Sequence, residues 1–371
     1  MLFDKMVDKS KTRKWNVDDG VLAMHIADMD FACPPAIEHA IQERAKTPDF
    51  GYGYVPDEYY DAVINWNERR HNLHFEKDWI KLMFGTNGVL RYAVQCFCNP
   101  GDSVMINTPV YGPFNEAIED GNCNPVYNRL AVKDNRYYLD FDLMEKQIIE
   151  NKVKVYIFCN PHNPGGRIWE KEELYKLADI CIKHDVLLIS DEVHREMAFK
   201  PFVTMWNSHP EIADHSIFAC SLNKAFNLGG LKSSYIAIKN KKIREKYLAY
   251  VSRMYVTSPH AFVVPATLAG YNESEEWLDE LVEYIKGNFE FVYKFFEEKF
   301  PEYDVMKADS SYLVWIRMGE GYEDLFKKAK IKPSPGWEFV DNYDGWVRLN
   351  LGTPRYIIEE ALNRLYKQKL C

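Results

Sequence analysis

The segment from Ser221 to Gly230 reads "SLNKAFNLGG" and holds a single lysine, Lys224, shortly after the apolar run "SIFACS". A lysine at the end of a buried strand is either a solvated charge at a loop tip or a nucleophile held in a pocket. In an apolar pocket a lysine loses its proton readily, and the free amine can form a Schiff base with an aldehyde. Residues at other strand ends decide between these two interpretations.

Polar and aromatic residues follow several other apolar runs that we expect to be strands. Asp191 lies in "LLISDEVH", where a buried carboxylate needs a cationic or protonated partner, although a simple helix N-cap is the alternative. Asn163 lies in the rigid turn "CNPHNPGG", and Tyr111 in "TPVYG" offers a ring for stacking unless it is a core or rim residue. Arg348 in "GWVRLNLGTPR" suits bidentate capture of a carboxylate.

The segment "FGTNGVL" predicts a phosphate site, because Thr86, Asn87 and Gly88 lie between a strand and a helix start. Free backbone N–H groups at such a start bind anions, although glycines before helices are also common without a ligand. Ser221 and Lys232 are further candidate phosphate donors. An anion site, a stacking ring, a carboxylate for a ring nitrogen and an amine for an aldehyde together describe a site for pyridoxal 5′-phosphate.

The motifs "TNGV", "TPVYGPF", "NPHNPGG", "SDEVH", "SLNK" and "VRLNLGTPR" follow one another along the chain. This ordered set resembles the fold-type-I pyridoxal-phosphate enzymes of the aminotransferase class I/II superfamily over essentially the whole length. The segment "HIADMDFACPPAI" is similar to the cystathionine β-lyase branch, as are "FDKMVDKSKTRKW" and "FGYGYVP". The resemblance implies a large domain with a mostly parallel seven-stranded sheet and a small α+β domain.

The resemblance also implies roles for the residues that match these motifs. Lys224 would be the Schiff-base lysine and general base, Asp191 would pair with the pyridine nitrogen, and Asn163 would donate to the phenolic oxygen. Tyr111 would stack on the ring and face the leaving group, as a catalytic residue beside Lys224 and Asp191. Arg348 would bind the substrate carboxylate.

Further expected contacts concern the phosphate group. By resemblance, Gly88, Val89 and Ser221 would hold the phosphate of pyridoxal 5′-phosphate. Tyr52 would reach the phosphate bound to the neighbouring subunit, so the resemblance implies a homodimer. The sequence "TNGVL" differs from "PGVV", which is common at this loop in the superfamily.

Three residues near the expected cofactor also depart from the common aminotransferase pattern. Asn223 precedes the lysine where serine is common, and Lys232 stands where aminotransferases commonly have a phosphate-binding arginine. A lysine can still bind phosphate as a point charge. His194 stands where many aminotransferases have a tyrosine that tunes the phenolic oxygen, and the lyase branch often has histidine there.

Short apolar, β-rich segments alternate with amphipathic segments between residues 45 and 265. This alternation predicts an α/β fold with a mostly parallel sheet and helices on both of its faces. A long amphipathic pattern predicts one helix over 275–300, interrupted at Gly287. The expected strands cover residues 81–85, 103–109, 153–161, 186–192 and 216–221.

The pattern also predicts how the chain divides into domains. We expect an N-terminal arm with part of the small domain at 1–44, a large cofactor-binding domain at 45–269 and a small C-terminal domain at 270–371. No internal repeat or Pro/Gly-rich linker interrupts these parts.

Composition and charge favour small molecules as ligands. The formal net charge of −9 disfavours nucleic acid and anionic membrane surfaces, whose phosphates would be repelled. The sequence has no apolar run long enough to span a membrane, its N-terminus is charged, and its 8 cysteines are scattered, so we expect a soluble cytoplasmic protein with free thiols. His71 and His74 have ligand spacing, but without a neighbouring cysteine or acid we expect no metal site.

The residues and the resemblance together predict a carbon–sulfur β-lyase. Such an enzyme cleaves an amino acid with a β-thioether by β-elimination and releases thiol, pyruvate and ammonia. An aminotransferase is the alternative, because it shares every step through α-proton removal; the "ADMDF" segment favours the lyase. A cofactor-bound regulator that acts by binding another protein is a third, weaker hypothesis.

Overall fold

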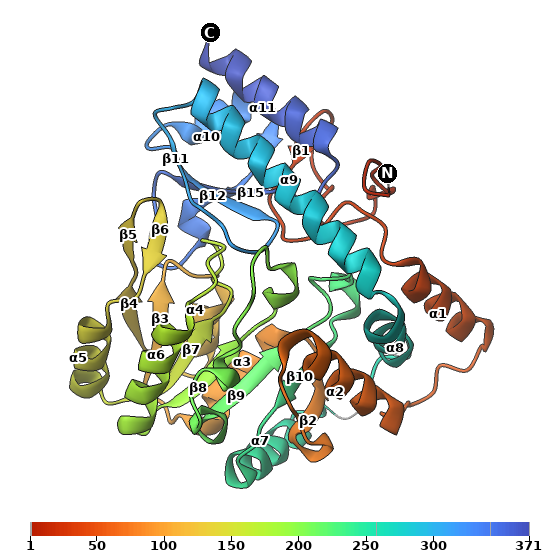
Figure 1. Cartoon of the computed structure of the whole chain (residues 1–371), viewed down its shortest axis with the longest axis vertical. Coiled ribbons are helices and arrows are strands. Elements are labelled where there is room, and N and C mark those ends of the chain that lie inside the picture. Colours follow the sequence, from red (N-terminus) through yellow and green to blue (C-terminus); the bar gives the residue numbers. More distant parts are fainter. Residues whose placement is uncertain (1, 257, 342, 371) are drawn as a thin grey trace.

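The computed structural model describes residues 2–256, 258–341 and 343–370, and its largest sheet has 7 strands in the order β2-β10-β9-β8-β7-β3-β4 (Figure 1). All neighbouring strands from β9 to β4 are parallel, whereas β10 is antiparallel to both β9 and β2. The predicted mostly parallel sheet is therefore confirmed. Its strands are β2 (Ile80–Met83), β3 (Ser103–Thr108), β4 (Asn124–Arg129), β7 (Val153–Cys159), β8 (Leu187–Asp191), β9 (Ser216–Cys220) and β10 (Ser234–Ala237).

Helices cover both faces of this sheet, because its inner strands are apolar on both sides. Val104 and Ile106 of β3 pack into the cluster formed with α3, α4 and α7, whereas Met105 between them packs into the cluster formed with α5 and α6. A short hairpin, β5 (Ala131–Lys133) and β6 (Arg136–Tyr138), extends beyond β4. The helices are α3 (Thr86–Phe97), α4 (Pro113–Asp120), α5 (Phe141–Asn151), α6 (Lys171–Lys183) and α7 (Lys241–Arg253).

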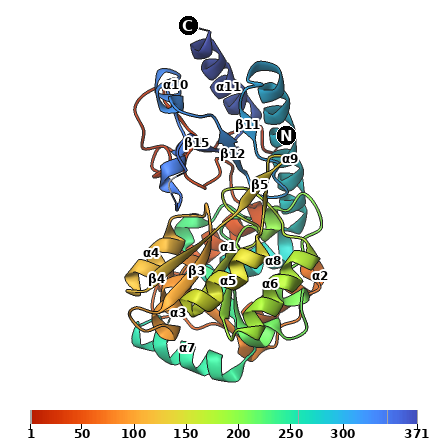
Figure 2. The same ribbon diagram turned by 90° about the vertical axis from the view of Figure 1, so that its left-hand side faces the viewer.

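A second, antiparallel sheet of 4 strands lies at the opposite end of the molecule (Figures 1 and 2). The helix predicted over 275–300 is confirmed as α9, which runs beside this sheet and α11. The strands of this sheet are β11 (Asp304–Val305), β12 (Leu313–Arg317), β14 (Ser334–Pro335) and β15 (Trp346–Asn350). The helices of this region are α9 (Glu275–Lys299), α10 (Tyr322–Lys328) and α11 (Arg355–Lys369).

The N-terminal segment joins both parts of the chain. Its strand β1 (Leu22–Ala23) pairs in parallel with β13 (Ile331–Lys332), next to the second sheet. The predicted domain limits stay a prediction, and the one at 269 falls within α8. The other helices are α1 (Pro35–Lys46), α2 (Asp57–His71) and α8 (Val263–Glu273), with 3-10 helices η1 (Lys77–Trp79), η2 (Arg195–Met197), η3 (Met205–Asn207), η4 (Ile212–His215), η5 (Gly229–Leu231) and η6 (Gly336–Glu338).

None of the helices within the described ranges has the length and apolar character needed to cross a membrane.

A buried ion pair links two parts of the N-terminal segment. Lys14 Nζ lies 2.8 Å from Asp30 Oδ2, and neither side chain is exposed to solvent. Trp15 Nε1 donates to Asp30 Oδ1 at 2.7 Å, and Lys14 Nζ also donates to the Asp28 carbonyl at 3.0 Å. These bonds satisfy both charges, and removal of one partner would leave the other charge buried without compensation.

We predict that Lys14→Met lowers the free energy of unfolding by about 3–5 kcal/mol, because Asp30 then keeps an unpaired buried charge. Urea unfolding followed by circular dichroism measures this loss. Lys14→Met combined with Asp30→Asn should recover part of it. As a control, Lys77→Met breaks the exposed ion pair with Asp57 and should leave the urea concentration at the midpoint of unfolding nearly unchanged. Equal effects of Lys14→Met and Lys77→Met would contradict the prediction.

Candidate functional site

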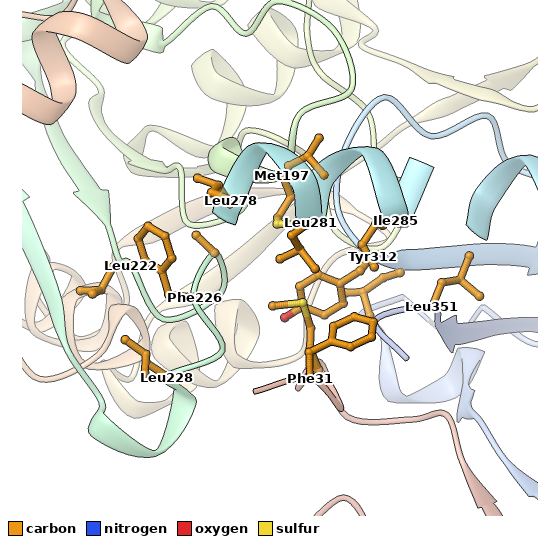
Figure 3. Packing of buried hydrophobic residues seen from close by; sticks show 14 of the residues in the cluster. Phe31, Met197, Leu222, Phe226, Leu228, Leu278, Leu281, Ile285, Tyr312 and Leu351 are labelled. Carbon is orange, nitrogen blue, oxygen red and sulfur yellow. The ribbon is translucent and has the colours of Figure 1, made fainter. Parts of the chain in front are cut away.

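Lys224 lies in the loop that follows β9, and its apolar neighbours fix this loop. Leu222 and Phe226 are buried in one cluster with Leu278 and Leu281 of α9 (Figure 3). Both flanks of Lys224 are thus anchored in the core, and Lys224 itself is half-buried. This burial favours the interpretation as a held amine over that of a solvated loop tip, and the Schiff-base role of Lys224 stays a prediction.

The Lys224 amine forms a hydrogen bond with a backbone carbonyl. Its Nζ donates to the Ala27 carbonyl at 2.7 Å, and the Tyr312 hydroxyl donates to the same oxygen at 3.2 Å. Burial, together with the charge of Arg348, lowers the pKa of Lys224 from 10.5 to about 8, although Asp28 and Asp191 act in the opposite direction. At neutral pH most of this amine is still protonated, but its unprotonated fraction is far larger than that of an ordinary lysine.

Asn227 holds the segment that carries Ala27 against the lysine loop. Its backbone is left-handed, with φ of 58°, a conformation that asparagine tolerates better than most residues. Its Nδ2 donates to the Met29 carbonyl at 3.0 Å and to the Phe31 carbonyl at 2.8 Å. Its Oδ1 accepts the Met29 N–H at 3.0 Å. One side chain thus fixes three backbone groups of the "ADMDF" segment.

Asn350 of β15 holds the same segment from the other side. Its Nδ2 donates to the Ile26 carbonyl at 2.6 Å and to the Asp28 carbonyl at 2.8 Å. These two residues flank Ala27 in the chain. The carbonyl that accepts from Lys224 is therefore oriented by amide side chains of both sheet regions.

Asp191 is the last residue of β8 and is buried, as expected for an acid at this strand end. Its Oδ1 accepts the Val193 N–H at 3.1 Å. Burial raises the pKa of Asp191 to about 6, although this hydrogen bond and the charge of Lys224 lower it. A buried carboxylate of this kind gains stability from a cationic or protonated partner such as a pyridinium nitrogen.

Arg348 and Asn163 lie together. Arg348 Nη1 donates to Asn163 Oδ1 at 3.0 Å, and its Nη2 donates to the Ser334 hydroxyl at 3.3 Å and to the His25 carbonyl at 3.4 Å. None of these acceptors is a carboxylate, and the buried Nε has no partner among the described residues. Burial lowers the pKa of Arg348 to about 10. A buried guanidinium with neutral partners and an unused donor is suited to bind an anion.

Tyr111 and His194 border the same region. Tyr111 is 36% exposed and forms a β-bridge with Phe339, whose ring lies 5.0 Å from the Arg348 guanidinium carbon. His194 is buried, and its Nδ1 has no hydrogen-bond partner among the described residues. Burial, with the charges of Lys224 and Arg348, lowers the pKa of His194 to about 3, so the imidazole is neutral.

The first turn of α3 offers the expected anion site. Thr86, Asn87 and Gly88 begin this helix, so their N–H groups have no partner inside it. The Val89 N–H donates to the Gly85 carbonyl at 3.4 Å and is already used. This geometry favours the three preceding N–H groups over Val89, and the phosphate role of Gly88 and Val89 stays a prediction.

Side chains from the lysine loop and from the residues before β10 lie beside each other as well. Ser221 Oγ donates to the Ser233 carbonyl at 2.5 Å, and Asn223 Nδ2 donates to the same oxygen at 2.8 Å. The buried Ser233 hydroxyl has no partner among the described residues, so it is an additional candidate phosphate donor that sequence reasoning missed. Lys232 is exposed, with a left-handed backbone φ of 49°.

Tyr52 stands apart from the other predicted site residues. Its side chain is 100% exposed, in the segment between α1 and α2. It forms no hydrogen bond or ring contact within the part of the chain that the structure describes. Its predicted contact with a neighbouring subunit stays a prediction.

One expectation about the histidines was wrong. We expected His71 and His74 to lack acidic partners, yet His71 Nε2 lies 2.8 Å from Glu196 Oε1 and His74 Nδ1 lies 2.6 Å from Glu68 Oε1. Glu196 is remote from His71 in sequence, so local spacing could not indicate the pair. Over the described ranges no group of three or more His, Cys, Asp or Glu side chains is arranged to hold a metal ion.

The residues present fit pyridoxal 5′-phosphate. Unpaired N–H groups and the Ser233 hydroxyl suit a phosphate, and a buried carboxyl at Asp191 suits a ring nitrogen. The unpaired Nδ1 of His194 is a polar atom that a bound ring system could satisfy. The amine of Lys224, with its lowered pKa, suits condensation with an aldehyde.

Comparisons with known proteins agree with this site. The sequence matches the family described as aminotransferase class I and II over residues 19–365. It is 34% identical to cystathionine β-lyase PatB of Bacillus subtilis, over 98% of this chain and 99% of that protein. The structure of a PLP-bound putative aminotransferase from Clostridium difficile is 33% identical and covers 99% of both chains, with a TM-score of 0.95. A PLP-bound C-S lyase from Staphylococcus hominis is 30% identical with a TM-score of 0.93, and the match covers 99% of this chain and 97% of that one. The chain therefore belongs to the aminotransferase class I and II family, and within it to the branch of the cystathionine β-lyases.

Proposed function

We propose that this protein is a pyridoxal-phosphate-dependent carbon–sulfur β-lyase. The proposal rests on two buried cations in the same region. The pKa of the Lys224 amine is lowered, and the Arg348 guanidinium has no carboxylate among its hydrogen-bond partners. The near full-length similarity to a cystathionine β-lyase and to a C-S lyase supports this reaction class.

In this proposal Arg348 binds the α-carboxylate of the amino-acid substrate. Its Nε is free, and its bonds to neutral acceptors are weaker than those it would make to a carboxylate. Asn163 holds the guanidinium, because its Oδ1 accepts from Arg348 Nη1. A fixed carboxylate orients the α-carbon toward Lys224.

Lys224 is proposed to accept the α-proton. When bound, pyridoxal phosphate supplies an aldehyde for the amine of the substrate and a ring that takes up electron density from its α-carbon. With substrate in the site, the unprotonated amine of Lys224 would remove the α-proton. The buried carboxyl of Asp191 would pair with the ring nitrogen and favour its protonated form.

The leaving thiol departs on the side that Tyr111 faces. In β-elimination the electron pair released at the α-carbon forms the new α,β double bond. The carbon–sulfur bond breaks, and sulfur leaves with the bonding pair and takes a proton. Hydrolysis of the remaining three-carbon unit gives pyruvate and ammonia. Tyr111 is partly exposed to solvent, so a departing group beside it would have access to water.

An aminotransferase is the second candidate, because a solved structure described as a putative aminotransferase is 33% identical. It would use Lys224, Asp191 and Arg348 in the same way up to α-proton removal. The two reactions differ afterwards, since transamination breaks no bond at the β-carbon and needs a keto acid to complete the cycle.

We further propose a homodimer that acts in the cytoplasm. Large apolar side chains are exposed around the segment of Tyr52, and burial of such side chains in an interface is favourable. The 7 described cysteines are unpaired, as in a reducing compartment. The exposed side chains include Phe50 (58%), Tyr52 (100%), Tyr54 (80%) and Tyr255 (87%).

We predict that the purified holoenzyme releases pyruvate and thiol from cystathionine without any keto acid. Lactate dehydrogenase coupling measures pyruvate, and a thiol reagent measures the second product. Lys224→Ala should reduce the rate at least about a thousandfold, because the general base and the cofactor linkage are both lost. Strict dependence on a keto-acid acceptor would identify an aminotransferase instead.

We predict that Lys224 in the apoprotein reacts with trinitrobenzenesulfonate with a midpoint near pH 8, because its pKa is lowered to about 8. Below this pH the amine is protonated and unreactive, and above it the rate reaches a plateau. Peptide mass spectrometry against pH measures the labelling. Arg348→Gln removes a neighbouring positive charge and should move the midpoint upward, whereas Arg91→Gln, at a surface pair, should not. A midpoint near the ordinary 10.5 in the unmodified protein would refute the idea.

We predict that Tyr52 acts across a dimer interface. Tyr52→Phe should weaken pyridoxal-phosphate affinity by about tenfold, the value of one hydrogen bond to a charged group. Hybrids refolded from Tyr52→Phe and Lys224→Ala chains should regain wild-type affinity in one site of two, since that site combines an intact Lys224 with an intact Tyr52. Cofactor titration by absorbance measures this recovery, and its absence would place Tyr52 in its own subunit's site.

A further inference from the structure

Tyr312 directly precedes β12, and sequence reasoning did not identify it as a residue of the site. Its exposed fraction is 1%, and its ring is buried in one cluster with Leu281 and Ile285 of α9 (Figure 3). The centre of the ring also lies 6.3 Å from that of His194. The core therefore fixes the ring, while the hydroxyl group reaches the region of Lys224.

The Tyr312 hydroxyl and the Lys224 amine share one acceptor. Both donate to the Ala27 carbonyl oxygen, the hydroxyl at 3.2 Å and the amine at 2.7 Å. Burial raises the pKa of Tyr312 far above its ordinary value, so the hydroxyl keeps its proton and stays a donor. The two donors use both lone pairs of this oxygen, and each reduces the electron density that is left for the other.

This competition affects the two protonation states of Lys224 unequally. A hydrogen bond from a charged donor is roughly twice as strong as one from a neutral donor, so the ammonium form depends more on the Ala27 oxygen than the neutral amine does. A second donor on the same oxygen therefore costs the ammonium form more. The Tyr312 hydroxyl thus favours loss of the proton from Lys224.

The backbone before Tyr312 constrains the position of its side chain. Ser311 has a φ of 80°, which lies in a region that residues other than glycine rarely adopt. Its N–H donates to the Met197 carbonyl at 3.0 Å, and Ser310 Oγ donates to the His194 carbonyl at 3.2 Å. A backbone of this kind persists only where surrounding contacts enforce it, and such positions concentrate at functional sites.

We propose that Tyr312 is a positioning residue for Lys224: its hydroxyl shares the Ala27 carbonyl, weakens the hydrogen bond that holds the ammonium form, and so favours the free amine. This inference rests on the role of Lys224 in the proposed function. Arg348 acts on the lysine in the same direction through its charge. Tyr312 acts through the acceptor strength of one backbone oxygen.

Labelling of the full-length apoprotein with trinitrobenzenesulfonate over a range of pH tests this proposal. Tyr312→Phe keeps the ring and removes the competing donor, so the midpoint of Lys224 labelling should rise by about half a pH unit, part of the value of one hydrogen bond. At a fixed pH below the midpoint, the labelling rate should fall about threefold. The plateau rate at high pH should not change, because it reports the access of the reagent to the amine.

A purely structural role of Tyr312 would give a different result. If Tyr312→Phe loosened the packing, water and reagent would reach Lys224 more easily, and the plateau rate would rise together with the midpoint. Tyr293→Phe is the matched control, because Tyr293 of α9 also donates to a backbone carbonyl, that of Met306, at 3.2 Å. Its loss should change neither the midpoint nor the plateau rate of Lys224 labelling.

Replacement of Tyr312 with 3,5-difluorotyrosine tests the opposite sign and serves also if Tyr312→Phe does not fold. The fluorine atoms make the hydroxyl a stronger donor, so the midpoint should fall. The proposal would be overturned by an unchanged or lowered midpoint in Tyr312→Phe, by a rise that comes with a faster plateau, or by a midpoint that does not fall with difluorotyrosine. Labelling needs no turnover, so failure of the lyase reaction would show as missing pyruvate release and would leave these results unaffected.

Discussion

The site depends on the burial of two cations near each other without a carboxylate in contact with either. The hydrogen bonds of Lys224 and Arg348 go to carbonyl, amide and hydroxyl oxygens. Neutral acceptors satisfy donors but do not cancel charge, so burial lowers the pKa of both side chains. Acidic groups act on both cations only from a distance, and a bound anion would compensate their charge directly.

The scaffold holds these groups through apolar packing and amide side chains. Leu222 and Phe226 anchor the lysine loop against α9, so the position of the amine follows from the core (Figure 3). Asp191 is fixed because β8 lies in the middle of the large sheet, where both faces are covered by helices. Arg348 projects from β15 of the second sheet. The site is thus assembled from strands of both sheets, and it exists only when both are folded.

Much of this arrangement follows from the sequence, because polar residues that end apolar runs must gather at one edge of a parallel sheet. Asp191, Asn163 and Lys224 could be found in this way. The Ala27 carbonyl could not, since a backbone acceptor has no side-chain signature. The pair of His71 and Glu196 was missed because it joins residues that only the tertiary fold brings together. The strand β10 was not among the expected strands, and it is antiparallel to β9; the connection from β9 contains no α-helix, so it does not form the crossover that a parallel neighbour requires.

Asn227 and Asn350 both form hydrogen bonds to the short segment 26–31, and they belong to two separate sheet regions. Ala27 lies between the two residues that Asn350 contacts and two positions before Met29, which Asn227 contacts, so this short segment cannot follow one region without stretching the hydrogen bonds to the other. Any hinge rotation between the two sheets must therefore move the oxygen that accepts from Lys224. The hydrogen bond that the Lys224 amine donates is in this way coupled to the relative orientation of the two halves of the chain.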